Sequence, residues 1–310
     1  MINMNNFSLL LNDIQKAIPS LEVRENEPMS EHCSFKIGGP ARAMALPASI
    51  DEASALCVLL KSAGVSPLVI GNGTNLLVTD SPLSRFVIKM SDKMSTVEER
   101  GETGVFALCG VSLARLAVFC ARRSLTGLEF AHGIPGSLGG AVCMNAGAYG
   151  GEMKDVLKRI TYLDENGELG EKSGDEMELS YRHSAFSDNA CIVLGAELSL
   201  RAGNEEEILS RMRELSEKRR ASQPLDRPSA GSTFKRPAVG YAAALIDECG
   251  LKGFSIGGAQ VSEKHAGFVI NRGGASFDDV LSLISHIKET VFREKGIELC
   301  PEVKIIENNR

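Results

Sequence analysis

Two glycine-rich segments combine an adaptable backbone with small polar side chains. The first is GNGTN at 71–75, and the second is GLEFAHGIPGSLGGAVCMNAGAYGG at 127–151, which holds eight glycines in 25 residues. Backbone N–H groups in a concave glycine turn bind anions, because no bulky side chain keeps a phosphate at a distance. The two segments therefore predict a site for a long, phosphate-bearing ligand. Further hydrogen-bond donors there are the side chains of Thr74, Asn75, Ser137 and Asn145.

The first segment does not match the dinucleotide fingerprint of a Rossmann helix. Gly71 and Gly73 follow an apolar run, but the third glycine is expected at position 76, where Leu76 stands. The chain leaves the turn as a second apolar strand. An ordinary tight turn is the alternative for this segment, since short glycine motifs often match by chance. The alternative is weaker for 127–151, because each glycine costs a regular element about 0.5–1 kcal/mol, so we expect one long loop there.

The bulk properties describe an ordinary globular protein. The chain has 310 residues, of which 43% are hydrophobic and 24% charged, which is enough for two or three packed units. A net charge of −6 argues against nucleic acid or an anionic membrane as the main partner. The eight cysteines form no CxxC pair, and no zinc spacing, signal peptide or membrane span is evident. We expect a cytoplasmic protein with reduced thiols, no metal and no obligate protein partner.

The pattern of apolar residues changes along the chain. Residues 51–64 have helical spacing with acids at the start and Gly64 as a stop. Short β-rich segments follow from about 85 to 200, interrupted by one helix near 112–124. A helix over 204–224 has acids in its first turn and basic residues in its last. Helices and strands alternate after it, so we place a domain boundary near residue 203.

Several motifs resemble one known family. IGGPA at 37–41, VIGNGTNLLV at 69–78 and the glycine segment extended to 127–153 are similar to the flavin-binding signatures of the UDP-N-acetylenolpyruvoylglucosamine reductases, bacterial cell-wall enzymes. The resemblance runs in order through nearly the whole chain. Its later motifs are SYRHSAF at 180–186, SAGSTFKRP at 229–237, GAQVSEKHAGFVIN at 258–271 and PEVKII at 301–306.

The resemblance implies an α+β fold of the vanillyl-alcohol-oxidase type with noncovalent FAD. Residues 1–203 would form the FAD-binding domain, in two subdomains of about 1–80 and 81–203, and 204–310 would form the substrate-binding domain. We expect His32 and His132, near the flavin motifs, to pack or hydrogen-bond rather than to attach the flavin. The implied FAD contacts are Gly71, Asn72, Gly73, Thr74, Asn75, Gly133, Ile134, Pro135, Gly136, Ser137, Gly139, Gly140, Asn145 and Gly147.

The family's chemistry sets what the site must contain. NADPH reduces FAD, and hydride then passes to the vinyl carbon of an enolpyruvyl ether on UDP-N-acetylglucosamine, which yields UDP-N-acetylmuramate for peptidoglycan synthesis. Hydride addition to the methylene carbon leaves an enolate on the neighbouring carbon and carboxylate. The site therefore needs a cation at the carboxylate and a proton donor over the α-carbon.

Three residues match the family's positions for this work. The resemblance implies that Arg182 grips the substrate carboxylate, that Ser232 delivers the proton, and that Glu302 orients Ser232 or itself donates. Each has a plain alternative: a surface ion-pair arginine, a turn serine, or a solvent-facing glutamate. The two-residue strand period is expected to turn Val303 and Ile305 to the core and Glu302 to the other face. Only the joint match of three motifs favours the catalytic interpretation.

Other positions are implied less directly. Lys235 and Arg236 would meet the diphosphate or carboxylate of the substrate, with a solvated basic pair as the alternative. The stretch AAALI at 242–246 departs from a glycine and a basic residue that the family often carries, so the resemblance does not imply a substrate contact from that helix.

Two other functions remain open at this point. An FAD-dependent oxidase of the same superfamily would share the flavin loops but has no reason to keep GSTF and PEVK in place. A nucleotide-sugar binding protein without flavin would have no reason to keep both the glycine segments and the three reactive residues.

Overall fold

The computed structural model describes residues 4–187 and 189–308. It divides into two compact units, and neither is one continuous stretch of chain. The first unit comprises Met1–Glu25, Ala43–Asn72 and Arg85–Glu217. The second comprises Asn26–Arg42, Gly73–Ser84 and Lys218–Arg310.

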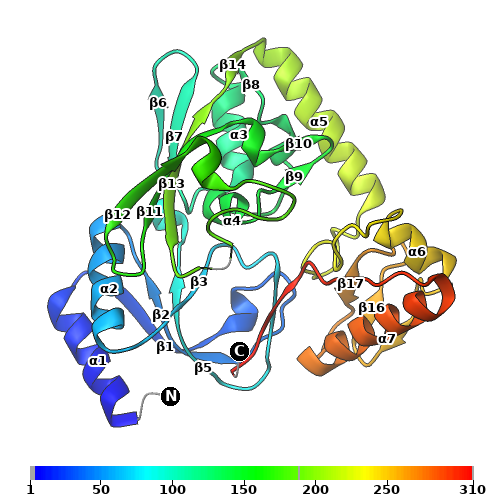
Figure 1. Cartoon of the computed structure of the whole chain (residues 1–310), viewed down its shortest axis with the longest axis horizontal. Helices are drawn as coiled ribbons and strands as arrows, with labels where there is room; N and C mark the ends of the chain where they lie inside the picture. Colours follow the sequence, from blue (N-terminus) through cyan, green and yellow to red (C-terminus); the bar gives the residue numbers. More distant parts are fainter. Residues whose placement is uncertain (1–3, 188, 309–310) are drawn as a thin grey trace. The chain divides into compact units, whose positions relative to one another are not determined.

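A five-stranded antiparallel sheet forms the centre of the first unit. Its strand order is β12-β11-β13-β7-β6, and these strands lie side by side in Figure 1. The short helix α4 (Leu138–Cys143) packs against β13 and β7. The strands are β6 (Val97–Arg100), β7 (Gly104–Leu108), β11 (Leu157–Leu163), β12 (Leu169–Ser173) and β13 (Ile192–Ser199).

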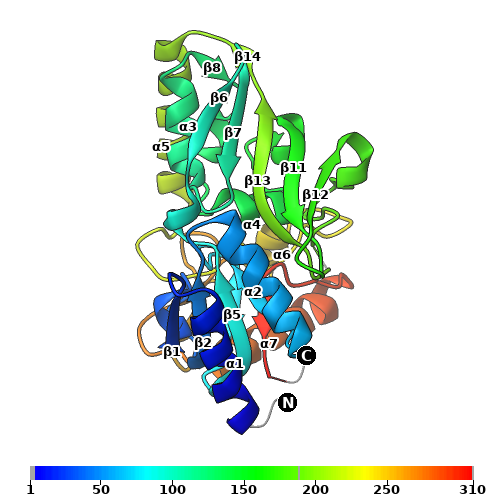
Figure 2. The ribbon, with the colours of Figure 1, turned by 90° about the vertical axis from the view of Figure 1, so that its left-hand side faces the viewer.

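A four-stranded sheet has most of its residues in the first unit. Its order is β1-β2-β5-β3, and β3 pairs with β5 in parallel. Two helices, α1 (Met4–Ala17) and α2 (Ile50–Ser62), pack against each other and lie side by side in Figure 2. The strands are β1 (Glu22–Pro28), β2 (Pro40–Leu46), β3 (Leu68–Ile70) and β5 (Leu83–Lys89).

The predicted helices of the first unit are confirmed. α2 begins after Ser49, whose hydroxyl accepts the N–H of Glu52, and α3 (Leu113–Ala121) begins after Ser112 in the same way. α5 (Glu205–Ser222) buries Ile208, Met212 and Leu215 on one face, as its spacing predicts. Among the described residues, no helix is long and apolar enough to cross a membrane.

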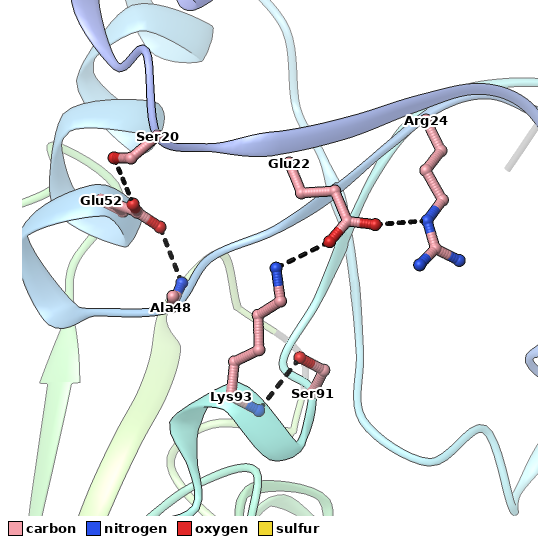
Figure 3. Close-up of polar contacts among 7 residues, drawn as sticks. All are labelled: Ser20, Glu22, Arg24, Ala48, Glu52, Ser91 and Lys93. Carbon is pink, nitrogen blue, oxygen red and sulfur yellow. Dashed lines mark hydrogen bonds and ion pairs between the residues drawn. The ribbon is translucent and has the colours of Figure 1, made fainter.

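Polar contacts connect β1 with the segments beside it (Figure 3). The Glu22 carboxylate accepts hydrogen bonds from Lys93 and Arg24, both at 2.7 Å. Nearby, the Glu52 carboxylate accepts from the Ser20 hydroxyl at 2.6 Å and from the Ala48 N–H at 2.7 Å. These contacts hold the start of α2 against the chain that leads into β1.

The second unit packs helices against short strands. β4 (Leu76–Val78) pairs in parallel with β18 (Lys304–Ile306), and β15 (Ser255–Ile256), β16 (Ala259–Val261) and β17 (Val269–Asn271) form an antiparallel sheet. The core gathers Phe35 and Leu77 with residues of α6 (Ala242–Glu248) and α7 (Phe277–Lys295). α7 has a capping box between Ser276 and Asp279 and ends at Gly296, where φ is 68°.

The predicted domain boundary at 203 does not coincide with the division between the units. Two N-terminal segments cluster with the C-terminal residues, and most of α5 clusters with the first unit. Long-range hydrogen bonds explain why the two N-terminal segments cluster with the C-terminal residues. Asn271 Nδ2 donates to the Phe35 carbonyl at 3.1 Å. The Phe277 N–H donates to the Asp80 carboxylate at 2.6 Å. The roles assigned to the predicted domains stay predictions.

Two local predictions need correction. Residues 127–151 are not one loop, because α4 includes Gly139 and Gly140, and residues 147–152 hold the hairpin of β9 (Gly147–Ala148) and β10 (Gly151–Glu152). The closing strand spans only Lys304–Ile306, so Glu302 precedes it. Val303 is buried and Ile305 packs half-buried against the same core cluster, whereas Lys304 is exposed, as expected; Ile306 is also buried.

The ion pair of Glu22 makes a testable contribution to stability. The hydrogen bonds from Lys93 and then Arg24 lower the pKa of Glu22 below its ordinary value of 4.5. A lowered folded-state pKa stabilises the fold above about pH 4.5, and this contribution is lost as the pH falls through the folded-state value. Glu22→Gln should therefore lower the free energy of unfolding by only about 0.5 kcal/mol at pH 7, because the ion pair is partly exposed to solvent. The cost should be smaller near pH 3, where Glu22 becomes protonated in the wild type.

Chemical denaturation at both pH values measures this difference. Glu25→Gln, at an exposed position of the same strand, serves as the control and should change the free energy of unfolding at pH 7 by less than Glu22→Gln does. A Glu22→Gln cost that grows on acidification would contradict the assignment.

Candidate active site

The two glycine segments meet within the first unit. Gly71 directly follows β3, and a Cβ at this position would overlap the Ser137 hydroxyl. Ser137 is buried and pairs through its backbone with Ser112. A side chain at position 71 would require the Ser137 hydroxyl to move, so the two predicted cofactor loops are in contact at Gly71 and Ser137.

The second half of the first segment belongs to the second unit. Gly73 has φ 62°, and a Cβ there would overlap the His32 carbonyl oxygen, so glycine is required on both counts. Asn75 Nδ2 donates to the Glu302 carbonyl at 3.1 Å, and the Lys304 N–H donates to the Asn75 carbonyl at 2.9 Å. The turn is therefore fastened directly beside Glu302.

Backbone hydrogen bonds hold the segment from Gly133 to Gly140 at both ends: the Ile134 N–H donates to the Ala131 carbonyl at 3.0 Å near its start. The N–H groups of Leu138 and Gly139 donate to the carbonyls of Val111 and Cys109, at 2.9 and 2.8 Å. A Cβ on Gly139 would come within 2.9 Å of the Cys109 Cβ, so this glycine serves close packing. Residues 133–136 are half-buried or exposed, and Gly140 is exposed with open space beside it.

Asn145 does not fit the predicted contact with a cofactor. Its exposed fraction is 0%, and Nδ2 already donates to Glu152 at 2.8 Å and to the Ser180 carbonyl at 3.0 Å. Its backbone N–H donates to Val142 at 3.1 Å. Gly147 is likewise packed, since a Cβ there would lie 2.8 Å from Glu152. The N–H donors of Asn145 are therefore all paired within the protein, and the missing side chain of Gly147 serves close packing; the predicted contact of Gly147 with a cofactor stays a prediction.

Arg182 stands at the tip of a tight turn in the first unit. Ser180 and His183 exchange backbone hydrogen bonds of 3.1 Å, which leaves Tyr181 and Arg182 between them. Arg182 has φ 54°, an uncommon conformation for a residue with a Cβ. Its guanidinium carbon lies 5.1 Å from the centre of the Tyr181 ring. The side chain is partly exposed, as a substrate-binding arginine must be.

Ser232 and Glu302 lie on two adjacent segments of the second unit. The Glu302 N–H donates to the Thr233 carbonyl at 2.8 Å, the Lys235 N–H donates to the Cys300 carbonyl at 2.8 Å, and Phe234 bridges to Pro301. Ser232 is exposed and Glu302 is half-buried. The structure therefore brings together the two predicted proton-handling residues, which are 70 positions apart in the chain.

Thr233, which sequence reasoning missed, holds these segments in place. Thr233 is only 3% exposed, and its hydroxyl accepts the Val269 N–H at 3.0 Å. Its own N–H donates to the Gly267 carbonyl at 2.8 Å, and its carbonyl accepts the Glu302 N–H. A single threonine in a proline-rich loop gives no sequence signal for this role, because its partners lie 34 to 69 positions away.

The remaining predicted residues occupy varied surroundings. Lys235 and Arg236 are exposed, and the Arg236 guanidinium lies 4.4 Å from the centre of the Tyr241 ring. His32 contacts Glu27 at 2.7 Å, and His132 contacts the Ser216 hydroxyl at 3.1 Å. Burial lowers the pKa of His132, which favours a neutral imidazole.

The thiol beside Gly139 is unreactive. Burial raises the pKa of Cys109 to about 12, so this thiol beside Gly139 stays protonated and is a poor nucleophile. Within residues 4–187 and 189–308, no group of three or more His, Cys, Asp or Glu side chains is arranged to hold a metal ion.

Comparisons with known proteins identify the family. Residues 41–171 match the FAD binding domain, and residues 223–306 match the C-terminal domain of UDP-N-acetylenolpyruvoylglucosamine reductase. The reductase of Caldanaerobacter subterraneus subsp. tengcongensis is 48% identical over 298 residues, covering 96% of this chain and 98% of that protein. The chain belongs to the UDP-N-acetylenolpyruvoylglucosamine reductase family.

Two further relatives support this assignment to the reductase family. The Syntrophomonas wolfei reductase is 46% identical over 297 residues, covering 96% of this chain and 99% of that protein. The crystal structure of UDP-N-acetylenolpyruvylglucosamine reductase from Thermus caldophilus superposes with a TM-score of 0.78 at 33% identity, over 93% of this chain and 99% of that one. The predicted α+β flavoprotein fold is thereby confirmed.

The residues present fit the FAD that this reductase family carries. Both glycine segments lie within the matched FAD binding domain, and they approach each other at Gly71 and Ser137. Residues 133–136 are half-buried or exposed and Gly140 is exposed, so backbone of the second segment is accessible to a phosphate-bearing ligand.

The role of Thr233 can be tested through stability. Thr233→Val keeps the shape but leaves the buried Val269 N–H without its acceptor, which should lower the free energy of unfolding by about 1–3 kcal/mol. Thr233→Ser keeps the hydroxyl and loses one methyl group, so it should cost about 0.8 kcal/mol. Urea denaturation ranks the two variants, and a valine variant as stable as the serine variant would contradict the hydrogen-bonded role.

Proposed function

We propose that this chain reduces the enolpyruvyl ether of UDP-N-acetylglucosamine to UDP-N-acetylmuramate with NADPH, using noncovalently bound FAD. The observation that carries the proposal is near-complete coverage of relatives with this activity in their name, at 46–48% identity. The adjacency of Ser232 and Glu302 supports it independently, because the reaction needs a proton donor with a partner. We place this reaction in the cytoplasm, as a step of peptidoglycan precursor synthesis that cell-wall growth, cell shape and division depend on.

FAD held by the two glycine segments would supply the redox chemistry, as the carrier of hydride between NADPH and the methylene carbon of the substrate. The protein's own residues must stabilise the negative charge that this hydride addition creates. Arg182 offers a planar guanidinium with paired donors, which suits a carboxylate that takes on enolate character. Its partly exposed position on a fixed turn supports this role.

Ser232 and Glu302 share the proton transfer in this proposal. The Ser232 hydroxyl donates its proton to the strongly basic α-carbon, which forms a C–H bond and leaves an alkoxide. The half-buried Glu302 carboxyl orients the hydroxyl and returns a proton to it. The short backbone connection through Thr233 supports this division of labour, because it fixes the spacing of the two side chains.

The basic residues after Ser232 would recognise the rest of the substrate. Lys235 and Arg236 are exposed, follow Ser232 by three and four positions, and carry the charge that a UDP diphosphate attracts. The stacking of Arg236 on Tyr241 limits its freedom and so favours a defined contact.

The cofactor proposal predicts a yellow protein. Purified protein should show flavin absorbance near 450 nm or take up one equivalent of added FAD, and denaturation should release the flavin because no covalent bond holds it. Protein that neither carries nor takes up flavin, or that keeps flavin after denaturation, would contradict noncovalent FAD binding.

Ser232→Ala should separate the two half-reactions. NADPH should reduce the flavin of this variant at the wild-type rate, whereas reoxidation by the enolpyruvyl UDP-sugar should slow by about 10²–10⁴-fold, because only the second step needs the proton. Anaerobic stopped-flow absorbance measures both. Equal loss of both half-reactions would point to a binding or folding defect and would contradict the assigned proton transfer.

A further inference from the structure

Asn145 is a fully buried residue whose side-chain amide is hydrogen-bonded to other segments of the first unit. Its exposed fraction is 0% and its φ is 39°, a left-handed conformation that asparagine tolerates better than most residues. Nδ2 donates to Glu152 Oε2 at 2.8 Å and to the Ser180 carbonyl at 3.0 Å, and Oδ1 accepts the Lys154 N–H at 2.9 Å. One amide thus joins three segments.

One of those segments carries Arg182. Ser180 is the first residue of the turn, and its carbonyl receives both the Asn145 amide and the His183 N–H. Arg182 sits two residues later with φ 54°. Such backbone conformations persist at functional sites only where the surroundings hold them, so the anchor at Ser180 has a direct consequence for the arginine.

The other side of the turn is fastened to the same place. The hydroxyls of Ser184 and Ser187 both donate to the Cys143 carbonyl, at 3.0 and 2.6 Å. Ser184 is 1% exposed, so this bond lies out of water. The turn is therefore attached before and after Arg182 to residues 143–145, at the C-terminal end of helix α4.

We propose that Asn145 is a positioning residue that sets the direction of Arg182 toward the substrate carboxylate, and not a ligand of the cofactor. This inference rests on the proposed function of Arg182. A guanidinium and a carboxylate pair well only over a narrow range of orientations, so a loosened turn weakens transition-state stabilisation while leaving flavin chemistry intact. The Glu152 carboxylate strengthens the arrangement, because a charged acceptor makes a stronger hydrogen bond with the amide.

The test uses Asn145→Gly, which keeps the positive φ and removes the amide. Flavin content and the rate of flavin reduction by NADPH should stay within about twofold of wild type, whereas reoxidation by the enolpyruvyl UDP-sugar should slow by about 10–100-fold. Asn145→Ala also removes the amide without adding a charge beside Glu152, and it should show the same pattern should the glycine variant fold poorly, at a cost in stability because φ is 39°. Lys154→Ala keeps the backbone bond to Asn145 and should behave as wild type.

A double-mutant cycle tests whether the effect of Asn145 on reoxidation passes through Arg182. Arg182→Lys alone should slow reoxidation strongly, and Asn145→Gly should add less than about twofold in that background, because it acts through the arginine. Full additivity, loss of flavin from the Asn145 variants, or an equal loss in Lys154→Ala would overturn the positioning role while leaving the function of Arg182 intact. Wild-type reoxidation in Arg182→Lys would instead overturn the role of Arg182, and the inference with it.

Discussion

The parallel pairing of β4 with β18 is the constraint on which the second unit's candidate chemistry depends. Buried backbone N–H and C=O groups must find partners, and here the Lys304 N–H donates to the Asn75 carbonyl and the Thr79 N–H donates to the Ile306 carbonyl, both at 2.9 Å. This pairing places Glu302 beside the first glycine turn. Because the Glu302 N–H then donates to the Thr233 carbonyl, the same ladder also fixes Ser232.

Several glycines and one asparagine of the loops make contacts within the protein, whereas the sequence suggested contacts with a ligand. Gly71 leaves room for the Ser137 hydroxyl, Gly73 for the His32 carbonyl and Gly139 for the Cys109 side chain. Asn145 connects the glycine segment to the turn of Arg182. These residues therefore serve the packing of the protein itself, and their contacts with a cofactor stay a proposal.

Local patterns predicted the helices well, because caps and apolar spacing act within a few residues. Ser49 before α2 and the acids and bases at the ends of α5 are such signals. The sequence could not reveal that Asn145 bonds to Ser180, 35 positions away, or that Asn75 bonds to Glu302, 227 positions away. The matched motifs named Ser232 and Glu302 but not Thr233 between them, since its role depends on tertiary hydrogen bonds alone.

The central claim is that a hydroxyl, a guanidinium and a carboxyl from three motifs act on one substrate. A crystal structure of the protein with FAD and the enolpyruvyl UDP-sugar tests it most directly. The account predicts the Ser232 Oγ about 3–3.5 Å from the substrate α-carbon, with the Arg182 guanidinium paired to the substrate carboxylate and Glu302 within hydrogen-bond reach of Ser232. A substrate bound with Ser232 or Arg182 outside contact distance would contradict it.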